Sequence, residues 1–240
     1  MLKRGGVRLL TSLKYRVDSL IFPNGEIYPT RKRKDWLAVK NISLLKVLEV
    51  DEILDIGVFT NGTPNLYKNF PEAFFHLIEP IPDLEVASLP SKYRSYNLGL
   101  SNRNEKARLN VADLSSSYEE RTKTAGIHPI TKQLITEVIT LDTFYERFLR
   151  KGKKLGIKID TEGMELKILE GLTNPDFISE IEFFILEVST RERFKDGYRA
   201  SDIFNWMGQN FFEFLTILNI PDQRNFFDII FVKKQALTLL

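Results

Sequence analysis

The stretch from Leu155 to Gly171 constrains the fold most, because its residue pattern changes once, from that of a strand to that of a helix. Ile157 and Ile159 alternate with polar residues, which predicts a short strand that ends at Ile159. The turn-forming residues 161–163 interrupt the alternation. Helical spacing follows, and Gly171 stands where a helix should end. The stretch therefore predicts a strand, a tight turn and a helix of an α/β fold.

Two acids, Asp160 and Glu162, follow this strand directly. Ligands of open α/β sheets bind at the carboxyl ends of the strands, where these acids fall. Two carboxylates and a lysine, Lys158, within five residues are costly to bury without partners, so we expect all three side chains to face a cleft. The alternative is that Asp160 or Thr161 only caps the following helix.

The composition excludes several kinds of site. The chain has 240 residues, 43% of them hydrophobic and 28% charged, which suits one soluble α/β domain with additions. The formal net charge of +2 does not by itself indicate a nucleic-acid partner. No cysteine and only two histidines are present, so thiolate and multi-histidine metal sites are excluded and we expect no metal. The absence of cysteine also fits a cytoplasmic location.

The N-terminal quarter is predicted to be a helical extension, residues 1–50, packed on a main domain of residues 51–240. Residues 1–22 are basic and weakly amphipathic; the alternative to packing is contact with an anionic membrane surface. The basic run 31–34 is expected to be a solvated loop or a phosphate contact. We find neither the apolar core of a signal peptide nor an apolar run that could span a membrane.

The segment from Glu52 to Glu79 has the pattern of a mononucleotide-binding unit. A strand runs into Gly57, where the lack of a side chain lets a ligand approach the backbone. A helix beginning near Pro64 would point its free amide groups at that ligand. The next strand, 73–78, ends at Glu79, 22 residues after Gly57, the spacing at which an acid binds ribose hydroxyls. The alternative is an ordinary strand-to-helix turn.

Five short motifs occur in a fixed order along the chain. They are Asp-Ile-Gly at 55–57, Ile-Glu-Pro at 78–80, Asn-Leu-Gly-Leu-Ser at 97–101, Thr-Leu-Asp at 140–142 and Lys-Ile-Asp-Thr-Glu-Gly at 158–163. Together they resemble the FkbM family of S-adenosylmethionine-dependent methyltransferases. The resemblance implies a Rossmann-like class I methyltransferase fold, with a mostly parallel seven-stranded sheet, an antiparallel last strand and helices on both faces. It also implies methyl transfer to oxygen, often a hydroxyl of a sugar or a polyketide-type product.

The resemblance assigns the cofactor-binding residues by position. For S-adenosylmethionine they are Asp55, Gly57, Gly62, Glu79, Pro80 and Asn97. The loop departs from the family pattern Asp-x-Gly-Ala-Asn-x-Gly, because here the asparagine–glycine pair at 61–62 is displaced by one residue.

The rest of the chain continues the α/β pattern. Strands are predicted at 93–100, 106–112 and 134–140, and a closing hairpin at 213–218 and 226–232. Asp142 is expected to cap the helix that follows it, and Ser201 or Asp202 to open another. The apolar run 181–187 predicts a central strand that brings Glu187 to the same edge. The polar segment 113–128 is a surface loop or a cover over the cleft, and its His128 a catalytic base or incidental.

The candidate catalytic residues are Asp160, Glu162 and Glu187. Methyl transfer to a hydroxyl requires donor and acceptor to be held close and a proton to be removed. One carboxylate could be the base, and the others could orient the acceptor or hold the amino group of the cofactor. The expected partner is a small-molecule or glycan acceptor, and the oligomeric state stays open. The alternatives are a nicotinamide-dependent oxidoreductase, although residues 57–62 lack Gly-x-Gly-x-x-Gly, or a non-catalytic nucleotide-binding module.

Overall fold

The computed structural model describes residues 19–21, 27–29, 39–83, 85–112, 116–122, 129–195, 197–218 and 226–240. The chain divides into two compact units, residues 1–36 and residues 37–240. In the first, β1 (Ser19–Ile21) pairs antiparallel with β2 (Ile27–Pro29). The prediction of a helix is therefore wrong at residues 19–21, while residues 1–18, the basic run 31–34 and His128 lie outside the described residues.

The larger unit is built on a sheet of seven strands in the order β11-β12-β10-β9-β3-β4-β5. Strands β10, β9, β3, β4 and β5 run parallel, and the last strand, β12, is antiparallel to β10, as predicted. The strands are β3 (Glu52–Ile56), β4 (Phe74–Ile78), β5 (Tyr93–Tyr96), β9 (Leu155–Ile159), β10 (Ile181–Ser189), β11 (Phe212–Ile217) and β12 (Phe226–Lys233).

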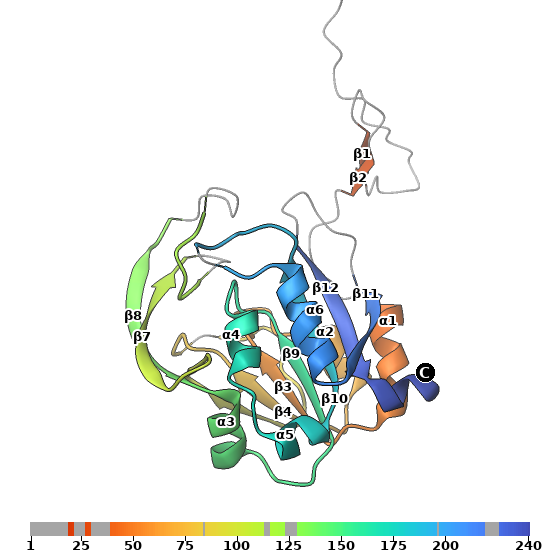
Figure 1. Ribbon diagram of the computed structural model, residues 1–240. Helices are drawn as coiled ribbons and strands as arrows, with labels where there is room; N and C mark the ends of the chain where they lie inside the picture. Colours follow the sequence, from red (N-terminus) through yellow and green to blue (C-terminus); the bar gives the residue numbers. More distant parts are fainter. Residues whose placement is uncertain are drawn as a thin grey trace, which may run out of the picture. The chain divides into compact units, whose positions relative to one another are not determined.

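Two hydrophobic cores lie on the two faces of this sheet (Figure 1). Side chains alternate across a strand, so Leu54 and Ile56 enter one core while Ile53 enters the other. The first core includes α3 (Leu141–Phe148), α4 (Glu165–Glu170), α5 (Pro175–Glu180) and α6 (Ala200–Gln209). The second includes α1 (Val39–Leu44), α2 (Pro64–Asn69) and the 3-10 helices η1 (Leu45–Leu48) and η3 (Lys234–Thr238).

A separate sheet of three strands, in the order β6-β8-β7, lies beside α3 and α4 in Figure 1. Its strands are β6 (Gly99–Leu100), β7 (Glu105–Val111) and β8 (Lys132–Ile139). The prediction of one continuous strand over 93–100 is therefore wrong. The chain leaves the main sheet at Asn97, whose side-chain amide donates hydrogen bonds to the carbonyls of Glu79 and Ile81.

Two predicted helix starts are also corrected. Thr140 caps α3, because its hydroxyl accepts from the amide of Thr143, while Asp142 accepts from the amides of Thr173 and Asn174. Helix α6 begins at Ala200, one or two residues before the predicted start at Ser201 or Asp202, and Asp202 accepts from the amide of Arg199 at this helix start. Within the described residues, no helix is long and apolar enough to cross a membrane.

Candidate functional site

A buried ion pair lies at the carboxyl ends of β3 and β9. Asp55 and Lys158 face each other across these strands, with Lys158 Nζ 3.2 Å from Asp55 Oδ1. The hydroxyl of Tyr67, on α2, donates to the other oxygen of Asp55, at 2.6 Å. Burial lowers the pKa of Lys158, but the charges of Asp55 and Asp160 outweigh it and raise this pKa above its ordinary value. Asp55 is fully buried. Its predicted role in cofactor binding stays a prediction, and any such role is indirect, through Lys158 and Tyr67, which contact its carboxylate.

The loop after β3 is shaped by close approaches of backbone to backbone. Gly57 has a φ of +81°, and a Cβ atom there would lie 1.8 Å from the carbonyl oxygen of Asp160. Gly62 has a φ of +62°, and its Cβ would lie 2.5 Å from the carbonyl oxygen of Ser88. Lys158 Nζ also donates to the carbonyl of Gly57, at 3.2 Å. Both glycines are thus required by neighbouring backbone, and the loop is held against the end of β9.

Glu79 closes the other side of this loop. Its Oε2 accepts a hydrogen bond from the amide of Phe59 at 3.0 Å, and its Oε1 accepts from the amide of Ile81 at 3.1 Å. Pro80 belongs to the same turn, and the side chain of Asn97, after β5, donates hydrogen bonds to it. Burial raises the pKa of Glu79. Each carboxylate oxygen has the capacity to accept a second hydrogen bond, so two acceptor positions are available to the hydroxyls of a ligand.

The turn after β9 leaves Asp160 more open than its neighbours. The side chain of Asp160 is 40% exposed, and Lys158 Nζ lies 3.6 Å from its Oδ2. The alternative that Asp160 or Thr161 caps α4 is wrong, because Met164 stands at the cap position and makes no side-chain cap. Instead the buried carboxylate of Glu165 accepts from the amides of Thr161 and Gly163, at 2.9 and 3.1 Å. The turn is therefore fixed without using the carboxylate of Asp160.

Arg193 joins the other two predicted catalytic acids. Its guanidinium donates to Glu162 Oε2 at 2.6 Å and to Glu187 Oε2 at 2.8 Å. A second arginine, Arg121, lies 3.3 Å from Glu162. Burial raises the pKa of Glu187 well above its usual range, and the charges of Asp160 and Glu162 raise it further. Of the three acids, Glu162 and Glu187 are held by arginine, and Asp160 is the one with an open side.

Residues 116–122 and 190–195 pack over this turn. The hydroxyl of Ser117 donates to the carbonyl of Glu162 at 2.7 Å, and the amide of Thr122 donates to the carbonyl of Arg193. The ring of Phe194 lies so close to Gly163 that a Cβ there would be 2.5 Å from it. The loop predicted as a possible cover therefore contacts the candidate site through its described residues 116–122.

Sequence reasoning did not select Glu165 or Arg193 as members of the site, and it wrongly expected Lys158 to face the cleft, whereas the structure buries it against Asp55. A signal existed for Lys158, because a cation flanked by isoleucines in a central strand must find a buried partner. No periodicity marks Arg193, which lies in irregular backbone after β10. Within the part of the chain that is described, no group of three or more histidine, aspartate or glutamate residues could hold a metal ion.

The architecture is that of a Rossmann-like class I methyltransferase fold: a mostly parallel seven-stranded sheet with an antiparallel last strand, a glycine loop after β3 and an acid after β4. The chain belongs to the FkbM family, since the model of the methyltransferase FkbM domain matches residues 59–216, well over half of its length. Family membership confirms the predicted methyltransferase class and S-adenosylmethionine as its cofactor, and it disfavours the oxidoreductase alternative.

Comparison with other proteins adds little about the reaction. No curated protein matches the chain. Magnesium protoporphyrin IX methyltransferase of Synechocystis PCC 6803, solved with bound S-adenosylmethionine, is 9% identical at a TM-score of 0.41, over 81% of this chain and 77% of that one. The fibrillarin pre-rRNA processing protein of Methanococcus jannaschii is 10% identical at a TM-score of 0.44, over 90% and 93%. At such scores these likenesses say nothing about the acceptor.

Proposed function

We propose that the protein transfers the methyl group of S-adenosylmethionine to a hydroxyl oxygen of a sugar, a glycan or a small-molecule natural product. The observation that supports this most is the placement of Asp160, a half-open carboxylate at the strand edge, against the loop at Gly57. A carboxylate that is not paired with a neighbouring arginine is available to accept a proton from a hydroxyl.

The residues around the loop fit the cofactor. The carboxylate of Glu79 keeps acceptor positions for ribose hydroxyls, while the amides of Phe59 and Ile81 hold it in place. The side-chain amide of Asn97 supports the same turn by donating hydrogen bonds to the carbonyls of Glu79 and Ile81. When bound, the cofactor supplies an electrophilic methyl group.

Each acid takes a different role in this proposal. Asp160 accepts the proton of the acceptor hydroxyl, and Lys158 orients it. Glu162 and Glu187 act through Arg193, which fixes the turn that carries Asp160. Holding the reacting groups in one geometry reduces the entropy lost on reaching the transition state.

The acceptor class and the compartment are part of the same proposal. A net charge of +2 gives no general attraction for nucleic acid, which favours a small or glycan acceptor. A chain without cysteine suits the reducing cytoplasm.

The test begins with calorimetry of S-adenosylmethionine binding and continues with a screen of hydroxylated acceptors, read by a mass gain of one methyl group. With an acceptor found, Asp160→Asn should lower kcat by about 10²-fold or more while leaving the melting temperature near that of the wild type. Glu162→Gln is the comparison, because it weakens a buried ion pair and should lower stability as well. Near-normal turnover of a folded Asp160→Asn protein would remove Asp160 as the base.

A further inference from the structure

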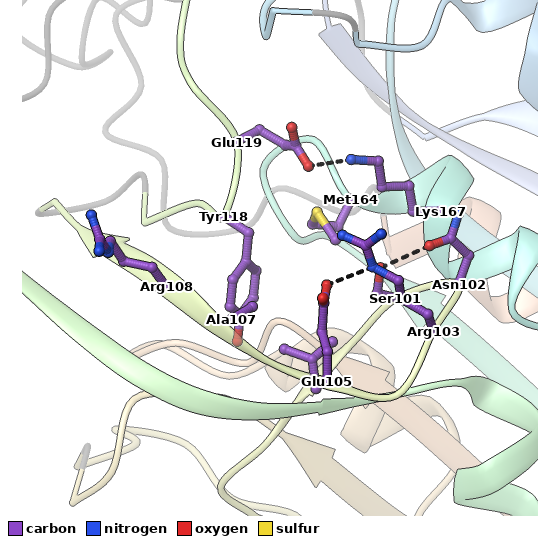
Figure 2. A pocket seen from close by; sticks show the side chains of 11 residues that line it. Ser101, Asn102, Arg103, Glu105, Ala107, Arg108, Tyr118, Glu119, Met164 and Lys167 are labelled. Carbon is purple, nitrogen blue, oxygen red and sulfur yellow. Dashed lines mark hydrogen bonds and ion pairs between the residues drawn. The ribbon is translucent and has the colours of Figure 1, made fainter.

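A pocket of about 420 Å³ lies between α4 and the three-stranded sheet (Figure 2). Its walls come from β7, from the chain between β6 and β7, from α4 and from residues 118–119. The polar side chains around it are Ser101, Asn102, Arg103, Glu105, Arg108, Tyr118, Glu119 and Lys167. None of these residues was assigned to the cofactor or to catalysis above.

Four of the five charged side chains of the pocket occur as pairs, and Arg108 is the fifth. Arg103 Nε lies 2.8 Å from Glu105 Oε1, and Lys167 Nζ lies 2.5 Å from Glu119 Oε1. Each pair therefore presents donors beside acceptors with little net charge. A lipophilic ligand would remove water from these four groups and offer no hydrogen bonds in place of those to water. Burying polar groups in this way is costly. A ring that carries several hydroxyl groups offers both donors and acceptors, so it suits these walls.

Tyr118 supplies an aromatic surface in the pocket. Its ring packs on the backbone of Gly99, where a Cβ atom would lie 2.3 Å from the phenol oxygen, and its hydroxyl is 2.7 Å from that of Thr136. Burial raises the pKa of Tyr118 to about 12, so the phenol is neutral at physiological pH. Figure 2 shows the ring between Arg108 and Met164. A fixed, neutral ring can pack against the apolar C–H face of a sugar.

The pocket adjoins the candidate active site through covalent neighbours. Met164, in its wall, directly follows Gly163 in the turn that carries Asp160 and Glu162. On the other side, Ser117 precedes Tyr118 and donates to the carbonyl of Glu162. A group bound in the pocket therefore contacts the same two segments that fix the catalytic turn.

We propose that this pocket binds a sugar ring of the methyl acceptor, which selects polyhydroxylated acceptors over lipophilic ones. The inference rests on the proposed function, because it takes the ligand of the pocket to be the molecule that is methylated.

The experiment fills the pocket from β7. Ala107→Trp adds an indole to its wall, and Lys106→Trp places the same side chain at the exposed neighbouring position of the same strand. The probes are methyl glycosides of a hexose, a 6-deoxyhexose and an N-acetylhexosamine. Their binding is measured by saturation-transfer NMR with S-adenosylhomocysteine present. We expect at least one glycoside to bind the wild type and Lys106→Trp, and to bind Ala107→Trp about tenfold more weakly or not at all.

A second variant covers the case in which Ala107→Trp does not fold. Lys167→Met removes one wall cation whose side chain is 42% exposed, and should weaken glycoside binding by about tenfold, the size of a lost charge-assisted hydrogen bond. The inference is overturned if no glycoside binds the wild type, or if the folded variants bind as well as it does. Affinity for S-adenosylhomocysteine, measured in parallel, separates the two proposals: its absence in the wild type contradicts the proposed function, whereas its presence without glycoside binding contradicts only the pocket.

Discussion

Replacing Arg193 by methionine tests whether one cation holds two buried acids. The side chain of Arg193 is 6% exposed, and those of its partners Glu187 and Glu162 are 8% and 20% exposed. Removing one member of a buried ion pair costs about 3–5 kcal/mol, since the remaining charge has no partner. Glu162 keeps Arg121 as a second partner, so we expect a loss near the lower end, about 3 kcal/mol at neutral pH.

The loss should depend on pH, and the sign follows from the glutamates. Burial already holds the pKa of Glu187 well above its usual range, and that of Glu162 is also raised. Without Arg193 both pKa values rise further in the folded state. A carboxyl group whose pKa is raised by folding contributes stability that is present below its unfolded pKa and is lost as pH rises through the folded pKa. Arg193→Met should therefore be closer to the wild type at about pH 5 than at about pH 8.

Urea unfolding at these two pH values measures the effect. Lys195→Met is the matched control, because Lys195 lies 3.6 Å from Glu120 and both side chains are well exposed, so it should cost less than about 1 kcal/mol. The double variant Arg193→Met/Glu187→Gln should recover part of the loss, since it removes one unpaired charge. A cost below about 1 kcal/mol at pH 8, or an equal cost at both values, would refute the reasoning.

Two further predictions concern the acid after β4 and the glycine after β3. Glu79→Ala should weaken S-adenosylmethionine binding by about 1–3 kcal/mol, the loss of charge-assisted hydrogen bonds; unchanged affinity by calorimetry in a folded variant removes Glu79 from the site. Gly57→Ala should destabilise the protein more than Gly152→Ala does. Both glycines have positive φ, +81° and +78°, but a Cβ at Gly57 meets the carbonyl oxygen of Asp160 at 1.8 Å, whereas nothing lies within 4 Å at Gly152. Thermal unfolding compares the two, and equal melting temperatures contradict the close approach.

Local pattern determined much of the fold. The alternation before Ile159 and the helical spacing up to Gly171 predicted β9 and α4, because strand and helix periods are read from neighbouring residues. Asp160, Glu162 and Glu187, at the carboxyl ends of β9 and β10, were likewise predicted at one edge, since the carboxyl ends of parallel strands share an edge. The mostly parallel seven-stranded sheet and its antiparallel last strand were correctly predicted from the resemblance to the FkbM family, not from periodicity.

Predictions from the residue type alone were wrong where a side chain had two possible partners. Asp142 has the residue type of a helix cap, yet it binds the amides of Thr173 and Asn174, while Thr140 caps α3. The strand expected over 93–100 breaks at Asn97 because its amide reaches carbonyls in the turn after β4. In both cases the side chain, of Asp142 or of Asn97, binds partners that are distant in sequence.

The sequence by itself therefore determined which acids stand at the edge of the sheet, and the tertiary structure decided which of them are open to a ligand. Asp55 is closed off because the strand register places Lys158 opposite it. Glu162 and Glu187 are closed off by Arg193, which is 31 residues from Glu162 along the chain. Such pairings depend on how the loop after β10 packs on the turn after β9. No local period records that packing, because it is set by burial and charge between segments that meet only in the folded chain.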